Sequence, residues 1–380
     1  MRMLTRLVVG VAAAAAATAM AAVPALADPN PGTVPKPNNI VGVGSDTIQN
    51  VMDQFSHDYN ATHTANKLYS WDATNPKTGA VGDPIVTKSG CSAIPRPDGS
   101  SAGITALTTE NAKTSGDPCM DFARSSRDRA PTDPPYAAGG IAFVDLAGDA
   151  VTWAANSTTN APATLTTAQL VKIYECTDTN WSQVGGKSGT IKAFLPQSGS
   201  GTRAFFLTAL GGGVTPITPG PCVSSPATLE ENEGVNPLLA GPDTIFPFSI
   251  GKWIAETDHS ATCFNKTCTA NSTGKVCAPK SGQNLYGCNT HGTMVLKKTN
   301  GTAPTTGSGT SQKINAGFSK AFVRTLFEVV PYTTSTSDHI STKLEPFFGH
   351  KGWVCANATA KADLLHYGFI VHTSTCGNTH

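Results

Sequence analysis

The sequence predicts an α/β protein, because short apolar runs alternate with segments that show helical periodicity. Residues 40–43 are an apolar strand candidate, and a turn of glycine, serine, aspartate and threonine follows at 44–47. Apolar residues then recur at helical spacing from Ile48 to Tyr59. This order of strand, polar turn and helix returns further along the chain, so the architecture is expected throughout.

Further elements follow from the same two signals, apolar periodicity and capping residues. A buried strand is expected at 139–146 and a further strand at 293–298. Helices are expected at 167–174 with Thr166 or Thr167 as N-cap, from 202 to a triple glycine at 211–213, at 318–329, and after Asn357 through Leu365.

The N-terminus predicts export. Arg2 and Arg6 precede an apolar, alanine-rich stretch at 7–23, and small residues end at Ala27. This pattern is typical of a secretory signal peptide cleaved after about Ala27. A membrane anchor is the alternative, and Pro24 and the small residues disfavour it. No cysteine follows the cleavage site, so no lipid anchor is expected, and the protein is predicted to be secreted, periplasmic or at the cell surface.

The charge balance excludes some classes of partner. The full chain has 27 lysines and arginines against 26 acidic residues, and removal of Arg2 and Arg6 leaves 25 against 26, a net charge near −1. Nucleic-acid and membrane-surface proteins usually carry a basic patch, so neither partner is expected. A mature length of about 350 residues predicts two domains.

The cysteines predict disulfides, because an even number of them in an exported chain is typical of cross-links. Spacing does not fix the connectivity, and our working hypothesis pairs neighbours along the chain. The alternative is a zinc site, which the lack of any C-x-x-C pair and any H-x₃-H pair disfavours. The ten cysteines would pair as 91–119, 176–222, 263–268, 277–288 and 355–376.

Helix starts with serine, threonine and glycine predict an anion site. The first turn of a helix has backbone N–H groups without partners, and the peptide dipoles add partial positive charge there. Phosphate or sulfate suits such a start, and hydroxyls add donors. Any one such junction is usually an ordinary cap, but four in one chain favour a shared ligand. The four are Ser45-Asp46-Thr47, Ser100-Ser101, Ser125-Ser126 and Ser200-Gly201-Thr202, with Arg96, Arg124, Arg127 and Arg203 as candidate cations.

These motifs resemble those of a known family, the PstS-like phosphate-binding proteins of bacterial ABC-type phosphate uptake, in the type II periplasmic-binding-protein superfamily. The resemblance runs from about Ile40 to Leu210 and more loosely to the C-terminus. It rests on GVGSDT at 42–47, GSSAG at 99–103, DFARSSR at 121–127, GGIAFVDL at 139–146, LTTAQLVKIY at 165–174 and GSGTR at 199–203.

The resemblance implies a two-lobed α/β fold with a hinge. It also implies that an oxyanion, with phosphate as the leading candidate, is clamped between the lobes. Lobe 1 would hold 40–138 and 310–380 after an extended leader at 28–39. Lobe 2 would hold 139–309, with a disulfide-stapled insertion at about 259–290. It also implies a monomer that serves an ABC transporter, with no enzymatic activity and no cofactor. Ligand contacts are expected at Ser45, Asp46, Thr47, Ser100, Ser101, Arg124, Ser125, Ser126, Ser200, Gly201, Thr202 and Arg203.

The chain departs from the family pattern at two places. The family commonly has an aspartate where Ser126 stands and an arginine where Pro196 and Gln197 stand. That aspartate accepts the proton of hydrogen phosphate, which sulfate lacks. The sequence therefore does not decide which oxyanion binds. Asp46 is a candidate to replace the missing proton acceptor, and Arg203 is a candidate to replace the missing positive charge.

Two alternative functions stay open. A secreted phosphatase or esterase could use Ser200 as nucleophile, although no histidine motif and no G-x-S-x-G elbow accompanies it. A surface or adhesion protein could keep the fold without binding a ligand, and the cysteine-rich segment and the departures at Ser126 and Pro196 favour that possibility.

Overall fold

The fold is known from a computed structural model. The predicted signal peptide and the predicted disulfides 263–268 and 277–288 lie outside the described residues. The structure describes residues 28–29, 34–76, 78–111, 117–258, 269–271, 274–276 and 291–380.

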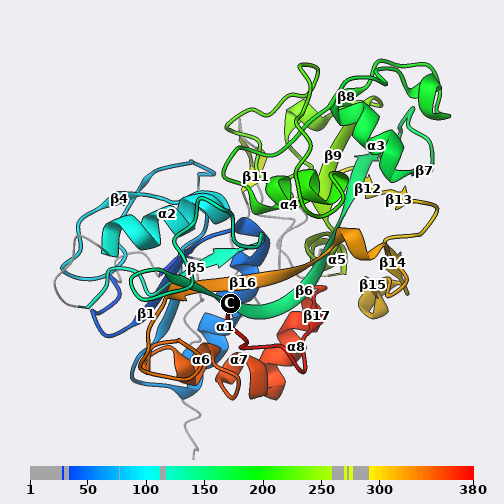
Figure 1. The fold of residues 1–380 in the computed structure, drawn as a ribbon. Coiled ribbons are helices and arrows are strands. Elements are labelled where there is room, and N and C mark those ends of the chain that lie inside the picture. Colours follow the sequence, from blue (N-terminus) through cyan, green and yellow to red (C-terminus); the bar gives the residue numbers. More distant parts are fainter. Residues whose placement is uncertain are drawn as a thin grey trace, which may run out of the picture.

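A mixed sheet organises the chain, which confirms the α/β prediction (Figure 1). Strand β1 pairs in parallel with β2 and β5, and β16 pairs antiparallel with both β5 and β6. The order across the sheet is β2 (Leu68–Ser70), β1 (Ile40–Gly44), β5 (Phe122–Ser125), β16 (Val323–Pro331), β6 (Ile141–Asn156), β9 (Thr244–Ser249) and β8 (Lys192–Ala193).

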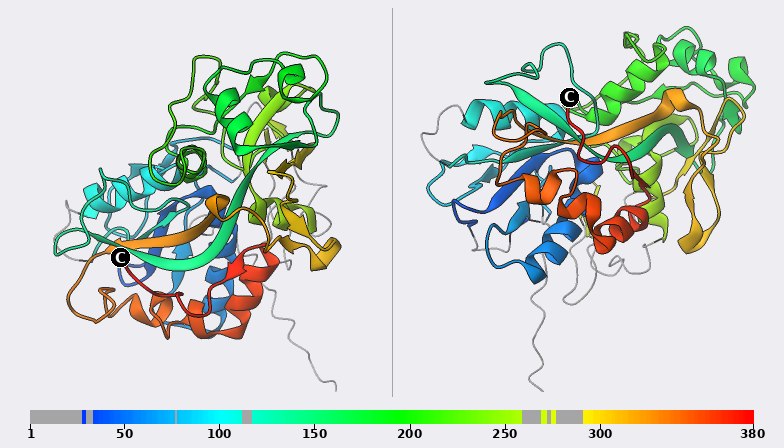
Figure 2. Two further views of the ribbon diagram at one scale, coloured as in Figure 1. Left: turned by 45° about the vertical axis from the view of Figure 1, so that its right-hand side comes forward. Right: turned by 60° about the horizontal axis from the view of Figure 1, so that its bottom comes forward.

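Strand β6 connects two groups of elements. Its first part pairs with β16 over 141–150, and its last part pairs with β9 and with β12 (Met294–Leu296). Figures 1 and 2 show β6 and β16 running from the group around β1, α1 and α2 to the group around α3, α4 and β9. The predicted strand at 139–146 thus continues to Asn156. The assignment of 40–138 and 310–380 to one lobe and 139–309 to the other stays a prediction.

Helices cover both faces of the sheet around β1. Helix α1 (Asp46–Thr62) packs with the C-terminal helices α6 (Glu345–Phe348), α7 (Trp353–Ala356) and α8 (Ala358–His366), and Phe55 and Trp353 meet edge to face. Helix α2 (Gly99–Asn111) packs on the other face, where Ile104 and Leu107 join Val43 and Phe143 in a second apolar cluster. Burial on both faces fixes where α1 and α2 begin relative to the strand ends.

Three helices confirm the capping and end signals that the sequence predicts. Thr166 caps α3 (Thr167–Tyr174) in a reciprocal pair with Gln169, and α4 (Gly201–Leu210) ends at Gly211. Asn357 caps α8 as predicted. The remaining elements are α5 (Ile250–Asp258), β3 (Pro84–Ile85), β4 (Ile94–Pro95), β7 (Thr164–Leu165), β10 (Thr269–Asn271), β11 (Gly274–Val276), β13 (Lys298–Thr299), β14 (Thr305–Thr306), β15 (Lys313–Ile314), β17 (Ile370–Val371) and the 3₁₀ turns η1 (Trp181–Val184), η2 (Pro237–Leu239), η3 (Gly309–Ser311) and η4 (Lys320–Phe322).

The helix predicted at 318–329 is wrong. Residues 320–322 form only a 3₁₀ turn, and Val323–Pro331 is the central strand β16. A strand between two neighbours is apolar on both faces, so it lacks the alternation that distinguishes it from a buried helix. Its three valines and Thr325 are β-branched residues that favour a strand. The error matters because this strand carries Arg324 into the site.

Disulfides cross-link three places in the described chain. Cys91–Cys119, Cys176–Cys222 and Cys355–Cys376 form, which confirms these three predicted pairs. The second bond fastens the segment after α4 to the end of α3. No helix within the described ranges combines the length and the apolar character needed to cross a membrane.

Candidate functional site

The start of α1 supplies the first part of the site. Strand β1 ends at Gly44, whose φ of 110° lies in the left-handed region, and a Cβ there would approach the Arg124 carbonyl oxygen to 2.7 Å. The Ser45 amide donates to that same carbonyl oxygen at 3.1 Å, and α1 begins at the next residue. The backbone therefore turns directly from the sheet into the helix, which leaves the side chains of Ser45 and Thr47 at the carboxyl end of β1.

The start of α2 and the end of β5 supply the second part. The Ser126 amide donates to Ser100 Oγ at 3.0 Å, and the Ser45 and Ser126 hydroxyl oxygens lie 3.0 Å apart. All three serines are buried. Three of the predicted Ser/Thr junctions thus meet, although they are far apart in the sequence.

The start of α4 closes the site from the other group of elements. Ser200 caps the helix by accepting from the Arg203 amide at 3.1 Å, and the Thr47 and Thr202 hydroxyl oxygens lie 3.2 Å apart. Gly201 lies so close to Ser100 and Ser126 that a Cβ would clash with both hydroxyl oxygens. Glycine is therefore required for this approach, and all four predicted junctions converge. We call their convergent residues, Ser45, Thr47, Ser100, Ser126, Ser200, Gly201 and Thr202, the cradle.

A carboxylate of the protein itself lies in the cradle. Glu231 Oε1 accepts from Thr47 Oγ1 at 2.6 Å and the Thr47 amide at 3.2 Å. The same oxygen accepts from Ser45 Oγ at 3.0 Å and Ser126 Oγ at 3.4 Å. Glu231 Oε2 accepts from the Ser200 hydroxyl and from the Thr202 amide at 2.9 Å. In this structure the amides and hydroxyls thus hold the carboxylate of Glu231, and the predicted binding of an external oxyanion at these residues stays a prediction.

Arg324 supplies the buried positive charge. Its guanidinium donates to Thr202 Oγ1 at 3.1 Å, to the Ser126 carbonyl oxygen at 2.8 Å, and to Asp149 Oδ2 from Nε and Nη2 at 3.0 and 2.8 Å. Burial by itself would raise the pKa of Glu231, but the Arg324 charge and the Ser200 and Thr47 hydrogen bonds lower this pKa to about 2. Glu231 is therefore ionised at neutral pH.

Burial raises the pKa of three other acids around the cradle. Burial, followed by the Glu231 charge, raises the pKa of Asp46 well above its usual range. Burial and the nearby Asp98 raise the pKa of Glu230 to about 10. Burial also raises the pKa of Asp98, to about 6. The cradle therefore holds the carboxylate of Glu231 beside the Arg324–Asp149 ion pair, and burial favours the neutral forms of Asp46 and Glu230.

Comparison with known proteins identifies the superfamily. The chain matches the family described as "PBP superfamily domain" over residues 16–303, which is most of its length. The chain belongs to the PBP superfamily. Among the described residues, no group of three or more His, Cys, Asp or Glu residues is placed to hold a metal ion.

Solved structures support this fold. An ABC-type phosphate transport receptor from Vibrio cholerae is 18% identical, with a TM-score of 0.50, over 88% of this chain and 100% of the other. A putative phosphate ABC transporter substrate-binding protein from Clostridium perfringens, with bound phosphate, is 13% identical, with a TM-score of 0.51, over 88% and 99%. The comparison with curated proteins finds no match. The type II fold predicted for this PBP chain is thereby confirmed.

Arg124, which we expected at the ligand, lies behind the cradle of this PBP. It donates to the Ser45 and Gly44 carbonyl oxygens at 2.9 and 2.8 Å and to Ser70 Oγ at 2.6 Å. The carbonyl oxygens that end β1 take up its donors, so it supports the turn into α1 and does not reach Glu231.

Other predicted side chains also bond elsewhere. Arg203 donates to the Pro196 carbonyl oxygen at 3.1 Å and to Ser225 Oγ, and the Ser125 hydroxyl donates to the Arg127 carbonyl oxygen. Arg127 donates to Ser101 Oγ at 3.1 Å and forms two bonds with Asp133 at 2.7 and 3.0 Å. Arg96 pairs with Asp28 and Asp83. The cradle therefore holds its oxyanion with neutral donors and a charge from β16.

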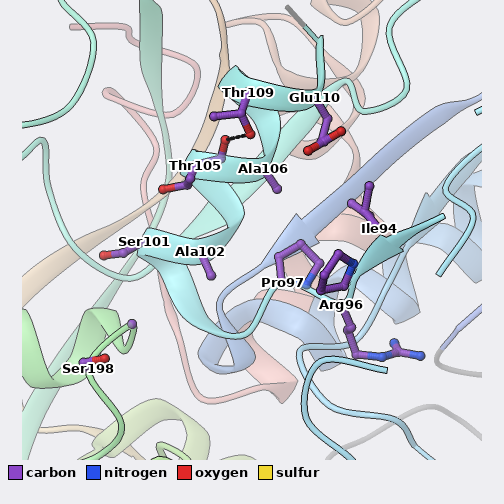
Figure 3. Close-up of a pocket in the computed structure, with 12 residues that line it drawn as sticks. Ile94, Arg96, Pro97, Ser101, Ala102, Thr105, Ala106, Thr109, Glu110 and Ser198 are labelled. Atoms are coloured by element: carbon purple, nitrogen blue, oxygen red, sulfur yellow. Dashed lines mark hydrogen bonds between the residues drawn. The ribbon is translucent and has the colours of Figure 1, made fainter. Parts of the chain in front are cut away.

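A groove beside the cradle is a separate feature. It has a volume of about 480 Å³ and lies between the outer side of α2, the segment after β4 and the loop at 198–199. Figure 3 shows Ser101 on α2 and Ser198 on that loop at its wall. Of the twelve predicted ligand contacts only Ser101 lines the groove, so the groove is not the oxyanion site.

Four residues at or beside the cradle were not predicted from the sequence, namely Glu231, Arg324, Asp149 and Asn232. Arg324 was hidden by the helical interpretation of its segment. Glu231 lies in LEENEG at 229–234, a loop without periodicity. One signal was present in that loop: asparagine tolerates the left-handed region better than most residues, and Asn232 has a φ of 61°. Asn232 donates to Thr47 Oγ1 at 3.1 Å and thereby holds the loop against α1.

Proposed function

We propose that this PBP chain is a secreted solute-binding protein that clamps an oxyanion between its two groups of elements, with phosphate as the leading candidate. One observation carries the proposal: six donors from the starts of α1 and α4 and from Ser126 already surround one carboxylate. Amides and hydroxyls that hold a carboxylate also suit phosphate, because both ligands present acceptor oxygens.

The names of two similar structures and the N-terminal pattern support a proposed partner and compartment. The Vibrio and Clostridium structures are named as phosphate-transport proteins, so an ABC transporter is the expected recipient of the ligand. The N-terminal pattern at 2–27 supports export. The mature chain would therefore bind phosphate outside the cytoplasm and act as a monomer.

A second candidate function is favoured by Glu231. A carboxylate already in the cradle satisfies the donors without any ligand, as expected of a surface protein that keeps the fold only for its shape. The hydrolase alternative has less support. Ser200 donates to Glu231, and a carboxylate with a pKa of about 2 is too weak a base to activate a serine.

Isothermal titration of the ligand-stripped mature chain with phosphate, sulfate and arsenate tests the proposal. We expect heat with phosphate, and we expect Ser45→Ala and Thr47→Ala, which remove hydroxyls that now donate to the Glu231 carboxylate, each to weaken binding by about 1–3 kcal/mol, the loss of a hydrogen bond to a charged group. Thr208→Ala is the matched control, because its hydroxyl bonds to the Ala204 carbonyl oxygen within α4.

Two results would contradict the proposal. Absence of heat with all three anions would favour the protein without a ligand. Turnover of p-nitrophenyl phosphate or p-nitrophenyl acetate, abolished by Ser200→Ala, would favour the hydrolase.

A further inference from the structure

The donors of the cradle have no capacity for a second oxyanion while Glu231 is in place. The Thr47 and Thr202 amides and the Ser45, Thr47 and Ser200 hydroxyls all lie within 3.2 Å of one of its two oxygens. A hydroxyl has one proton and a backbone amide has one proton. An incoming phosphate could reach them only after the carboxylate has left.

The loop around Glu231 is fastened on both sides. Before it, Leu229 is fully buried and its carbonyl oxygen accepts from the Gln197 amide at 2.9 Å. After it, Asn232 donates to Thr47 Oγ1 and accepts from the Ser249 amide at 3.0 Å. These bonds hold the backbone on either side of Glu231 to neighbouring elements. They therefore fix the position from which the Glu231 side chain enters the cradle.

The charges around Glu231 also favour exchange over joint binding. Asp46 on α1, Asp98 before α2 and Glu230 on the same loop are acids, and Arg324 on β16 is a cation whose charge acts on Glu231. Arg324 already pairs with Asp149, so its charge is shared. A phosphate dianion added beside Glu231 would place excess negative charge in a buried region, at a large desolvation cost.

We propose that Glu231 is an internal ligand of the oxyanion site, and that a free oxyanion binds only by displacing the Glu231 carboxylate from the cradle. This inference rests on the proposed function, because it names the competitor at the same site. An internal ligand weakens the apparent affinity for phosphate, because the apparent Kd equals the intrinsic Kd divided by the fraction of molecules whose site is free. Glu231 therefore sets the phosphate concentration at which the protein responds.

The test compares phosphate binding by the ligand-stripped wild type, Glu231→Gln and Glu233→Gln in isothermal titration. Glutamine keeps the size of Glu231 but loses its charge, and its amide group would face the Thr202 amide with a donor. We expect Glu231→Gln to bind inorganic phosphate at least about tenfold more tightly than the wild type. Glu233 is a matched control two residues along the same loop, where burial raises the carboxyl pKa to about 8, so glutamine replaces a neutral acid.

Equal affinity of the wild type and Glu231→Gln would overturn the internal ligand and leave the proposed function standing. Lack of phosphate binding by all three proteins would overturn the proposed function. A second measurement then decides the role of Glu231 without phosphate. The melting temperature of ligand-free Glu231→Gln should fall clearly below that of Glu233→Gln, because the Ser200 hydroxyl and the Thr202 amide lose their acceptor and the other four donors keep only a neutral one. Equal values would refute the role.

Discussion

Arg324 and Asp149 form a buried ion pair behind the cradle, with Nε and Nη2 of Arg324 at 3.0 and 2.8 Å from Asp149 Oδ2. The two residues come from the neighbouring strands β16 and β6 and lie opposite each other in the antiparallel register. Asp149 also accepts from Ser249 Oγ at 2.9 Å and from the Gly251 amide at 3.0 Å. The pair therefore ties the start of α5 to the strand that supplies the charge of the site.

Loss of the guanidinium should destabilise the protein strongly. Arg324→Met leaves Asp149 buried without its cation, and removal of one partner of such a pair costs about 3–5 kcal/mol. Urea unfolding measures this loss, and Asp149→Asn in the same chain should recover part of it. Arg203→Met is the control, because Arg203 bonds only to neutral groups among its described partners. A similar loss of unfolding free energy in Arg324→Met and Arg203→Met would contradict the role of the pair.

Gly201 should be necessary for binding. A Cβ at this position would clash with Ser100 and Ser126, so Gly201→Ala must push α4 away from the other junctions. We expect Gly201→Ala to weaken phosphate binding by about tenfold or more, or about 1.4 kcal/mol, in isothermal titration. Gly317→Ala is the matched control, because the nearest atom to a Cβ there lies 3.4 Å away. Equal affinity of the two variants would show that α4 need not approach so closely.

Local signals account for what the sequence predicted correctly. Ser45, Ser100, Ser126 and Ser200 stand at strand ends or helix starts that glycine, apolar spacing and capping residues mark in the chain. Because such signals act within a few residues, they predict where each junction lies. Their meeting at one point depends on the sheet order, which the sequence indicated only through a family resemblance.

Long-range contacts account for what the sequence did not predict. Glu231 bonds to Thr47, 184 residues earlier, and nothing around Glu231 marks it as a ligand. Arg124 matched the expected chemistry, but the carbonyl oxygens of Gly44 and Ser45 bind it instead. Arg324 was assigned to a helix because a strand buried on both faces lacks alternation. The functions of these residues depend on neighbours that are distant in the sequence, and residue type alone does not reveal those neighbours.

The effects on stability of Ser126→Asp and Glu231→Gln should be coupled. Ser126 stands where the resembling family commonly has an aspartate, and its hydroxyl lies 3.4 Å from Glu231 Oε1. Ser126→Asp would place two carboxylates side by side, so we expect a lower free energy of unfolding at pH 7 and a smaller deficit at pH 4, where protons can be shared. Adding Glu231→Gln should remove most of the deficit. A double-mutant cycle in urea measures the coupling, and purely additive losses would refute it.

Buried acids should make the protein more stable at pH 5 than at pH 8. Burial raises the pKa of Glu328 to about 8, although the Arg124 charge acts in the opposite direction. The folded state then holds a proton that the unfolded state loses near pH 4.5. The stabilising contribution is complete below that pH, and it falls by about 1.4 kcal/mol per pH unit until the folded carboxyl ionises near pH 8.

Urea unfolding between pH 5 and pH 8 measures this slope. Glu328→Gln should flatten the slope, because glutamine does not titrate, whereas Glu175→Gln at an exposed position should leave it unchanged. Glu231 should contribute the opposite sign. Its pKa of about 2 lies below the unfolded value, so its contribution is complete above about pH 4.5 and is lost as the pH falls toward 2. An identical slope in the wild type and in Glu328→Gln would show that Glu328 is ionised in the folded protein.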